Sequence, residues 1–174
     1  LAADIRSLFT NIPVDETIDI ICDTWYRIQK SPPKVASCAV SEDNLRSLLD
    51  AVTKNVKFAF NNQLFCQIDG LAMGSPLSGS FADVFVGDYE RSLLDSRPKK
   101  HVIKSYLRFV DDLHIVMHKD GIQSLQNDLR MLHRSLQFTM DEGAHFLDVN
   151  IHREAERVKT SVHRKTTFTG LYID

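Results

Sequence analysis

Two apolar runs, interrupted by a pair of aspartates, form the clearest pattern in the chain. Residues 106–117 have the sequence YLRFVDDLHIVM, in which β-branched and aromatic residues flank Asp111 and Asp112. Such runs favour β-strands, and an abrupt polar break between them favours a tight turn. The pattern therefore predicts a β-hairpin with both carboxylates at its tip.

Other short apolar runs predict further strands. Residues 1–4 are expected to form a short buried strand that ends in an aspartate. Residues 56–60 and 64–68 flank Asn61 and Asn62, a residue pair that is typical of a tight hairpin turn. Additional strands are expected at about residues 138–141, 146–151 and 158–163.

Apolar residues at helical spacing predict four amphipathic helices. The helices are expected from about Pro13, after the N-cap Ser41, from the Gly-Ser-Pro turn at 74–76 to about Arg97, and from Gly121 to Gln137. The residues expected to face inward are Val14, Ile18, Ile21, Trp25 and Ile28 in the first helix, Leu45, Leu48, Leu49 and Val52 in the second, Phe81, Val84, Phe85 and Leu93 in the third, and Ile122, Leu125, Leu129, Leu132 and Leu136 in the fourth. Residues 5–13 are expected to form an irregular turn, and the prolines at 32–33 a loop that runs to about Val40.

The order of these elements mixes strands and helices without a regular alternation of strand and helix. This order favours an α+β fold, in which helices pack on one face of an antiparallel sheet. With 174 residues, the chain is long enough for one domain with a sizeable core.

Composition places the chain among ordinary globular proteins. Hydrophobic residues make up 43% and charged residues 25%, and the net charge is −2. Basic residues are nevertheless concentrated in residues 152–165 and at 99–104, where they form either a solvated surface or a local nucleic-acid contact. No apolar run approaches the roughly 18 residues of a membrane span. The three cysteines form no CxxC pair, which favours reduced thiols in an intracellular protein.

The two adjacent aspartates have a structural and a chemical interpretation. Aspartate is a common turn residue, so the pair could serve the turn alone. Like charges so close together repel each other unless a cation neutralises them or one takes up a proton. A hard cation such as Mg²⁺ is the natural partner, and Asp4 would join the pair if the first strand lies beside the hairpin.

Several motifs together resemble a known family. DIRSLF, GLAMGSPLS and YLRFVDDLHIV are similar to palm motifs A, B and C of reverse transcriptases. SLFTNIP, FLDVNIHR and SVHRKTTFTGLY resemble Penelope-like retroelement polymerases in particular. The resemblance implies a polymerase palm with a ferredoxin-like or RRM-like sheet. Residues 1–150 would form the palm, incomplete at its N-terminus, and residues 146–174 a primer-grip-like hairpin and the start of the connection to the thumb.

The resemblance also implies the reaction and its catalytic residues. The chain would belong to an RNA-directed DNA polymerase, which adds a dNTP to the 3′-hydroxyl of a DNA primer on an RNA template. Asp4 and Asp111 would bind two Mg²⁺ ions, or Mn²⁺ in their place, with the backbone carbonyl of Ile5 as a further ligand. Asp112 would be the neighbouring, less direct carboxylate of the catalytic set.

Nucleotide-binding residues follow from the same likeness. Phe9 falls where reverse transcriptases place an aromatic gate against the ribose 2′-hydroxyl, with an ordinary core residue as the less favoured alternative. Arg6, Ser7 and Leu8 would lie along the triphosphate, with a plain surface position as the alternative for Arg6. Met73 and Gly74 would also contact the nucleotide.

Template and primer contacts are implied at three places. Gly74, Ser75 and Pro76 would pass under the nascent base pair, where the absent side chain of glycine permits close approach. A helix cap is the alternative for the serine and the proline, and a strand-end polar residue is the alternative for Gln67. The remaining residues implied in primer or template binding are Phe146, Leu147, Arg153, Arg164 and Lys165.

The chain departs from the family pattern at several positions. Gly79 stands where a second proline is usual, Phe109 replaces a tyrosine, and Thr166-Thr167 replaces a proline-threonine pair. The loop 141–145 has no lysine, so the general acid stays unassigned.

We also expect the chain to be a fragment that lacks its fingers, its thumb and an endonuclease domain, and that is inactive alone. The parent protein would be intracellular and nuclear, without a membrane partner. Three alternatives remain: a domesticated RNA-binding remnant, a two-metal nuclease, and an RNA-dependent RNA polymerase. The large aromatic residue Phe9 argues against an enzyme that must admit ribonucleotides.

Overall fold

The chain forms two compact units, each built from separate stretches of sequence. The computed structural model describes residues 1–29, 40–95, 103–141, 145–154 and 157–164. The first unit contains Leu1–Arg6, Pro98–Arg130 and Gln137–Asp174, and the second contains Ser7–Arg97 and Met131–Leu136. The chain therefore first passes from one unit to the other between Arg6 and Ser7, just after the strand Ala2–Ile5, which contains Asp4.

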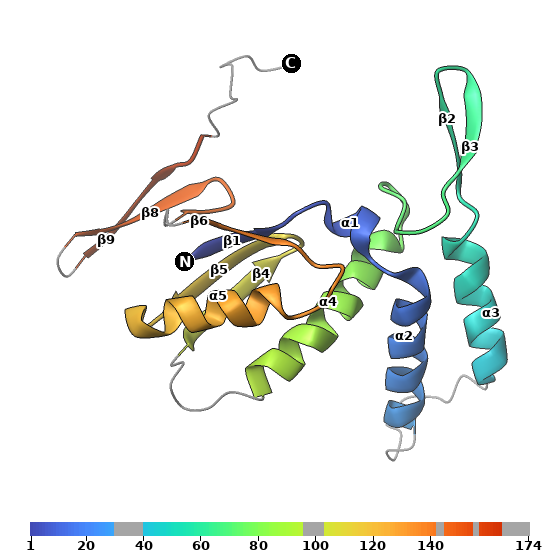
Figure 1. Cartoon of the computed structure of the whole chain (residues 1–174), viewed down its shortest axis with the longest axis horizontal. Coiled ribbons are helices and arrows are strands. Elements are labelled where there is room, and N and C mark those ends of the chain that lie inside the picture. Colours follow the sequence, from blue (N-terminus) through green and yellow to red (C-terminus); the bar gives the residue numbers. More distant parts are fainter. Residues whose placement is uncertain (30–39, 96–102, 142–144, 155–156, 165–174) are drawn as a thin grey trace. The chain divides into compact units, whose positions relative to one another are not determined.

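A four-stranded antiparallel sheet is the centre of the first unit (Figure 1). Its strands are β1 (Ala2–Ile5), β4 (Ile103–Phe109), β5 (Asp112–Met117) and β6 (Phe138–Asp141). The spatial order is β4-β5-β1-β6, and every neighbouring pair is antiparallel. Since helices connect β1 to β4 and β5 to β6, this is the split arrangement of a ferredoxin-like sheet. The predicted α+β class is confirmed.

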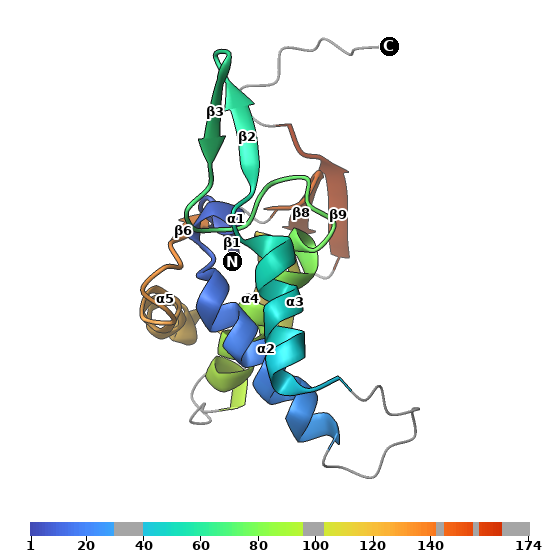
Figure 2. The same cartoon turned by 90° about the vertical axis from the view of Figure 1, so that its right-hand side faces the viewer.

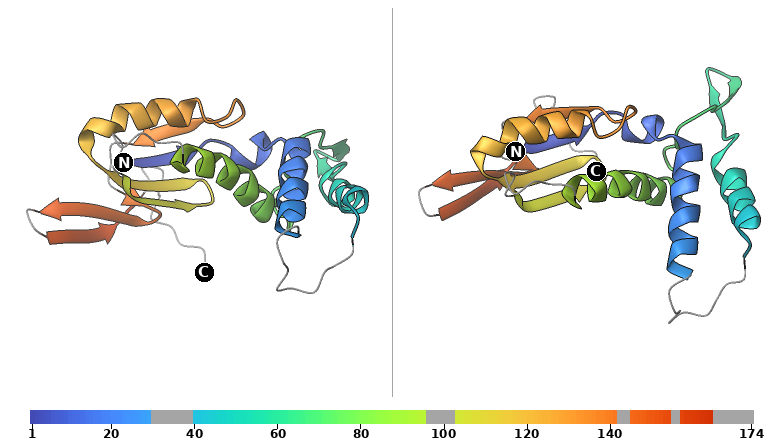
Figure 3. Two further views of the ribbon diagram at one scale, coloured as in Figure 1. Left: turned by 90° about the horizontal axis from the view of Figure 1, so that it is seen from below. Right: turned by 60° about the horizontal axis from the view of Figure 1, so that its bottom comes forward.

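The two faces of this sheet differ in burial. Ile5, Leu113 and Ile115 are each 1% exposed and form the core face. Helix α5 (Ile122–Arg130), which follows the short helix η1 (Lys119–Gly121), lies along that face in Figures 1 and 3. Because side chains alternate along a strand, Asp4 and Asp112 point to the opposite face, which α5 does not cover.

A second sheet in the first unit contains β7 (His145–Phe146), β8 (Val149–Glu154) and β9 (Arg157–Val162). The sequence predicted one strand over residues 146–151, and this prediction is wrong. Leu147 adopts a left-handed φ of 54°, which turns the chain between β7 and β8. The Phe146 ring lies 5.7 Å from the ring of His114, so β7 packs beside β5.

The second unit is mainly helical. It contains α1 (Leu8–Asn11), α2 (Val14–Gln29), α3 (Glu42–Thr53), α4 (Ser78–Asp95) and a hairpin of β2 (Lys57–Phe60) and β3 (Gln63–Cys66). Figure 2 shows α2 and α3 side by side, with the hairpin extending beyond the end of α3. The predicted cap is confirmed, because the Asn44 N–H donates to Ser41 Oγ at 3.3 Å. The predicted turn is also confirmed, since Asn61 and Asn62 both have positive φ.

Some residues predicted to face inward are exposed. Trp25 is 42%, Leu48 59%, Val52 49% and Val84 37% exposed. The buried positions of α2 and α4 instead include Thr17, Cys22, Ala82, Val86 and Glu90. Because α3 packs along α2 through one side only, part of its apolar stripe stays uncovered. Burial is thus set by which neighbours are present, and periodicity alone does not identify them.

The predicted helix 121–137 is too long, because α5 ends at Arg130. The next residues join the second unit, where the His133 ring lies 4.7 Å from Tyr89 and 5.1 Å from Phe85. His133 Nε2 is 3.3 Å from Glu16 Oε2, and the Tyr89 hydroxyl donates to the same carboxylate. Burial, and then this hydrogen bond, raise the pKa of Tyr89 to about 12. These contacts of His133 stabilise the chain more than a further turn of α5 would.

Three further predictions concern local features. The expected turn over residues 5–13 contains the helical turn α1. The expected loop at 31–34 and the end of the third helix at Arg97 lie outside the described residues. No helix in the described part of the chain is long and apolar enough to cross a membrane.

Candidate functional site

Asp4 and Asp112 face each other on neighbouring strands of the first unit. The register of β1 and β5 pairs them directly. One residue further, the Ile5 N–H donates to the carbonyl of Asp111 at 3.0 Å, and Leu1 and Ile115 exchange hydrogen bonds of 3.0 and 2.9 Å. Since hydrogen-bonded and non-hydrogen-bonded pairs alternate, Asp4 and Asp112 form a non-hydrogen-bonded pair. The Cα atoms of such pairs lie about 4.5 Å apart, with both side chains on one face.

This pairing has an electrostatic consequence. Like charges directly opposite each other on a sheet are destabilising, and both carboxylates are only half-buried. A divalent cation would convert the repulsion into a favourable interaction. Among the described residues, no three or more His, Cys, Asp and Glu side chains form a ready-made metal site. Mg²⁺ nevertheless fits, because it is commonly bound by one or two carboxylates, waters and the phosphates of a substrate.

Asp111 occupies the turn between β4 and β5, so the predicted position at the hairpin tip is confirmed. The other turn residue, Val110, has a φ of 56°. This left-handed conformation is unusual for a β-branched residue and costs free energy. The carbonyl of Val110 accepts a hydrogen bond from Arg108 Nη1 at 3.1 Å, which helps to hold the turn. The aspartates are thus presented by a strained turn that its sheet holds in place.

In the second unit, Phe9 is joined to the GLAMGSPLS segment. Its carbonyl accepts a hydrogen bond of 2.7 Å from the N–H of Leu71. The neighbouring Gly70 has a φ of 77°, and a Cβ there would lie 2.6 Å from the carbonyl oxygen of Thr10. Only glycine fits this contact. Sequence reasoning missed Gly70, although the Asp-Gly pair was a signal of a tight turn.

Phe9 itself is half-buried, and its neighbours differ in burial. Leu8 is 2% exposed and belongs to the core, whereas the side chains of Arg6 and Ser7 are exposed. The gate and core roles of Phe9 therefore both remain compatible with its burial. The triphosphate contacts of residues 6–8 stay predictions.

Ser78, which sequence reasoning missed, stabilises the loop before α4 through a hydrogen bond of its side chain. The buried hydroxyl of Ser78 donates to the carbonyl of Ala72 at 2.7 Å, and the same carbonyl accepts from the Ser75 N–H at 3.2 Å. Met73 is 73% exposed and Pro76 is exposed. Gly74 has a φ of 90°, and a Cβ there would meet nothing within 4 Å. The loop therefore presents an open backbone surface, as close approach to a ligand requires.

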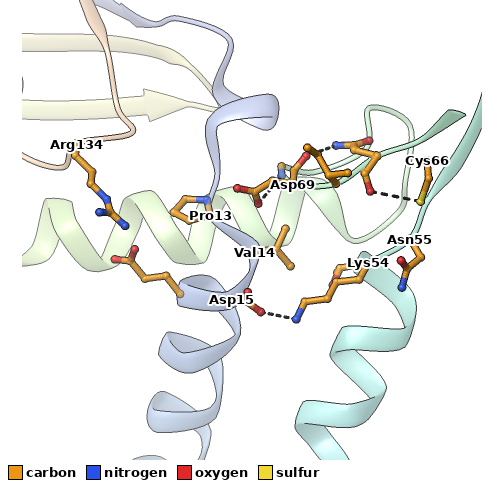
Figure 4. A pocket seen from close by; sticks show the side chains of 13 residues that line it. Pro13, Val14, Asp15, Lys54, Asn55, Cys66, Asp69 and Arg134 are labelled. Atoms are coloured by element: carbon orange, nitrogen blue, oxygen red, sulfur yellow. Dashed lines mark hydrogen bonds and ion pairs between the residues drawn. The ribbon is translucent and has the colours of Figure 1, made fainter.

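Gln67 lies in a different environment from the aspartates. Its Nε2 donates to the carbonyl of Asp69 at 3.0 Å, so the side chain already shapes its own loop. It also lines a pocket of about 570 Å³ in the second unit (Figure 4). The charged residues of that pocket are Asp15, Glu16, Lys54, Asp69 and Arg134, and Lys54 is paired with Asp15 and Asp50. Acidic groups outnumber basic ones there, which does not suit a phosphate site. A template contact of Gln67 stays a prediction.

The predicted primer-binding residues within the described part of the chain lie in the second sheet of the first unit (Phe146 and Arg153), in its first turn (Leu147) and just after its last strand (Arg164). Arg153 and Arg164 are exposed, Leu147 is 39% exposed, and Phe146 is half-buried. The register pairs Arg153 with Val158, so this arginine shares a face with valines, while Arg157 and Lys159 lie on the other face. The basic run is therefore divided between two faces. Lys165 lies outside the described residues.

Comparisons with known proteins support the fold. No protein-family model matches the chain, and no curated protein does. The structure is similar to telomerase from Candida albicans, solved in complex with a TWJ fragment of telomeric RNA, with a TM-score of 0.67 and 11% identity over 95% of this chain. It is also similar to apo telomerase from Candida tropicalis truncated from its C-terminal domain, with a TM-score of 0.61 and 14% identity over 92% of this chain. The chain spans 32% and 35% of those proteins, about a third of each. It therefore has a reverse-transcriptase-like fold.

Proposed function

We propose that the chain is the palm of an RNA-directed DNA polymerase from a retroelement of the Penelope-like type. The observation that carries this proposal is the direct pairing of Asp4 with Asp112, beside the turn residue Asp111, on the face of a reverse-transcriptase-like sheet that α5 does not cover. A purely structural sheet gains nothing from opposed carboxylates at this position.

In the proposed reaction, the 3′-oxygen of the primer attacks the α-phosphorus of a dNTP. The new P–O bond forms as the bond to pyrophosphate breaks, and the hydroxyl proton passes to water. Asp4, Asp111 and Asp112 would hold two Mg²⁺ ions, or Mn²⁺, with the Ile5 carbonyl as a further ligand. When bound, such ions activate the 3′-hydroxyl and neutralise charge on the leaving pyrophosphate. The residues of the chain supply the positioning, which is most of what phosphoryl transfer requires.

The second unit would supply the nucleotide and template contacts. The ring of Phe9 would exclude the ribose 2′-hydroxyl. The hydrogen bond from the Leu71 N–H to the Phe9 carbonyl would hold the backbone of Phe9 beside the GLAMGSPLS loop. Met73 and Gly74 would lie against the nucleotide, with Ser75 and Pro76 against the template strand. Arg153, Arg164 and Lys165 would meet primer or template phosphates in a salt-sensitive way. The TWJ fragment of telomeric RNA in the Candida albicans telomerase structure supports RNA as a partner.

The complete enzyme would include fingers and thumb, and the parent protein would act inside the cell, in the nucleus. We therefore expect the present chain to bind metal and nucleic acid but not to extend primers alone.

Primer extension tests this proposal. The longer polypeptide is supplied with an RNA template, a DNA primer and Mg²⁺, and with dNTPs or NTPs in parallel reactions. We expect extension with dNTPs only, and none for the Asp111→Asn variant. Asp120→Asn is the matched control, because Asp120 is an exposed aspartate in η1 that pairs only with His118 among the contacts described.

Other outcomes identify other functions. Extension with NTPs would instead show an RNA polymerase, and degradation of the template would show a nuclease. Template binding without any extension would show an RNA-binding remnant. Each of these results would contradict the proposal.

A further inference from the structure

The β2–β3 hairpin of the second unit presents an aromatic face to solvent. Phe58, Phe60 and Phe65 are 49%, 71% and 40% exposed. The register pairs Phe58 with Phe65 and Phe60 with Gln63, so the three rings and this amide share one face. The ring centroids of Phe58 and Phe65 lie 5.6 Å apart, and their planes are 21° from parallel. Exposed apolar side chains gathered in this way mark a binding surface.

The opposite face of the same hairpin has a different composition. It contains Lys57 opposite Cys66, and Ala59 opposite Leu64. Leu64 is 70% exposed, so this face also has a large apolar side chain in contact with water, but it has no aromatic ring. Strand propensity alone does not explain this distribution, because aromatic residues favour strands on either face. The rings on one face therefore require a reason of their own.

The charges around the hairpin favour a negatively charged partner. Residues 51–68 include two lysines, Lys54 and Lys57, and no aspartate or glutamate. Lys54 is paired with Asp15 and Asp50, whereas Lys57 is exposed and makes no ion pair among the described residues. The helices α2, α3 and α4 each carry more acidic than basic residues. The hairpin thus suits a polyanion better than the helices of its unit do.

We propose that the aromatic face of the β2–β3 hairpin binds unpaired RNA, whose bases stack on Phe58, Phe60 and Phe65. Bases stack on aromatic side chains without regard to sequence, because every base has a π-face. Phe58 and Phe60 are two residues apart on one strand, about 6.8 Å, which is twice the rise of about 3.4 Å between stacked bases. Their spacing therefore admits one base. The Gln63 amide adds hydrogen bonds to base edges, and the Lys57 ammonium attracts the phosphates.

RNA is chosen over other polyanions because the proposed function has an RNA template. Stacking itself needs neither a metal ion nor the polymerase reaction. The binding of unpaired RNA by the hairpin is consequently measured apart from primer extension, and the two are able to fail separately.

The test measures RNA binding by the full 174-residue chain in EDTA, which keeps the proposed metal site out of the measurement. The probe is a fluorescent, unpaired homopolymer RNA of about ten nucleotides, followed by anisotropy. We expect Phe60→Ala to raise the Kd about tenfold, the loss of one stacked base. Leu64→Ala is the matched control, because Leu64 is as exposed as Phe60 and lies on the other face, and it should change the Kd little.

Two further variants separate stacking from general apolar contact. Phe60→Trp keeps a planar ring and should bind RNA at least as tightly as the unmodified chain. Phe60→Leu keeps an apolar side chain without a ring and should bind as weakly as Phe60→Ala. Photocross-linking of the bound RNA should label residues 57–66.

Several results would overturn the proposed RNA site and leave the proposed function intact. They are an unchanged Kd in Phe60→Ala, an equal loss in Leu64→Ala, tighter binding of duplex RNA than of unpaired RNA, and cross-links confined to other residues. Self-association of the chain that Phe60→Ala abolishes, with unchanged RNA binding, would assign the face to a second copy. If Phe60→Ala disrupts the hairpin, equal Kd values for Phe60→Leu and Phe60→Trp would rule stacking out. RNA binding as expected, without primer extension by the longer polypeptide, would remove the proposed function and support the RNA site.

Discussion

Two of the tight hairpins in the described residues, β2–β3 and β4–β5, turn the chain with different residues. The β2–β3 hairpin turns at Asn61 and Asn62, whose φ values are 48° and 58°. Asparagine tolerates this left-handed conformation, which tight hairpin turns require. The β4–β5 hairpin turns at Val110 and Asp111, and its valine has a φ of 56° although a β-branched side chain disfavours it.

The surroundings of the two hairpins explain the difference. Every residue of β2 and β3 is exposed, and an isolated two-stranded sheet is only marginally stable. Its turn must therefore favour the hairpin by itself. The β4–β5 hairpin is held by β1, so it can tolerate a poor turn residue and two nearby carboxylates. The proposed function accounts for the second turn, because it requires Asp111 at this place.

The largest expected effect concerns Asp111. Replacing it by asparagine in the longer polypeptide should reduce primer extension about a thousandfold or more, because the proposed function makes this carboxylate a metal ligand. Primer–template binding, which depends mainly on basic side chains, should change little. Extension assays and a binding titration measure the two quantities. A near-normal extension rate in Asp111→Asn would show that the turn residue has no catalytic role.

Phe9→Ala tests the proposed nucleotide-binding part of the second unit and should have the next largest effect. If the ring is a gate, ribonucleotide incorporation should rise about a hundredfold relative to deoxynucleotide incorporation. If the ring is only core, the variant should lose about 3–5 kcal/mol of stability and both activities together. Extension with each nucleotide type, alongside a melting curve, separates the two. Equal loss with both nucleotides would end the gate hypothesis.

Asn62→Val tests the exposed hairpin. A β-branched residue at a φ of 58° should destabilise the turn by about 1–2 kcal/mol. Amide hydrogen exchange in residues 57–66 should become faster, while the sheet of the first unit keeps its protection. Unchanged exchange would mean that the turn residues do not hold this hairpin together.

Val110→Asn is the reciprocal change and should have the smallest effect. Asparagine adopts a φ of 56° more readily, so the chain should gain about 1 kcal/mol of stability. A chemical denaturation curve measures the gain. A loss of stability would show that the valine side chain makes a contact that offsets its backbone strain.

Local signals made much of this structure predictable. Ser41 before an amphipathic run, Asn61-Asn62 between two strands and the aspartates between apolar runs each identified their element correctly. The sequence could not reveal where α5 ends, because His133 leaves the helix to meet Glu16 and Tyr89, residues that are distant in the chain.

The sequence indicated that the first strand lies beside the aspartate hairpin, but not the register between them. Asp4 was expected to act with Asp111, and the strand pairing places Asp112 directly opposite it. That register depends on the turn at Val110–Asp111 and on the fit of β1 against β5, which no single stretch of sequence encodes. Gly70 and Ser78 were missed for a similar reason, since their partners Thr10 and Ala72 become visible only in the fold.

The effect of Mg²⁺ on thermal stability tests the central claim most directly. The claim is that Asp4 and Asp112 are opposed in order to hold a cation. Melting of the present chain is measured for the unmodified sequence, for Asp112→Asn and for the surface control Asp120→Asn, with EDTA and with millimolar Mg²⁺. Without metal, Asp112→Asn should be the more stable by about 0.2–1 kcal/mol, because a like-charge pair is removed. With Mg²⁺, the unmodified chain should gain stability by binding and overtake the variant, which should respond little. A variant that is less stable without metal, or that gains as much from Mg²⁺ as the unmodified chain, would contradict the account.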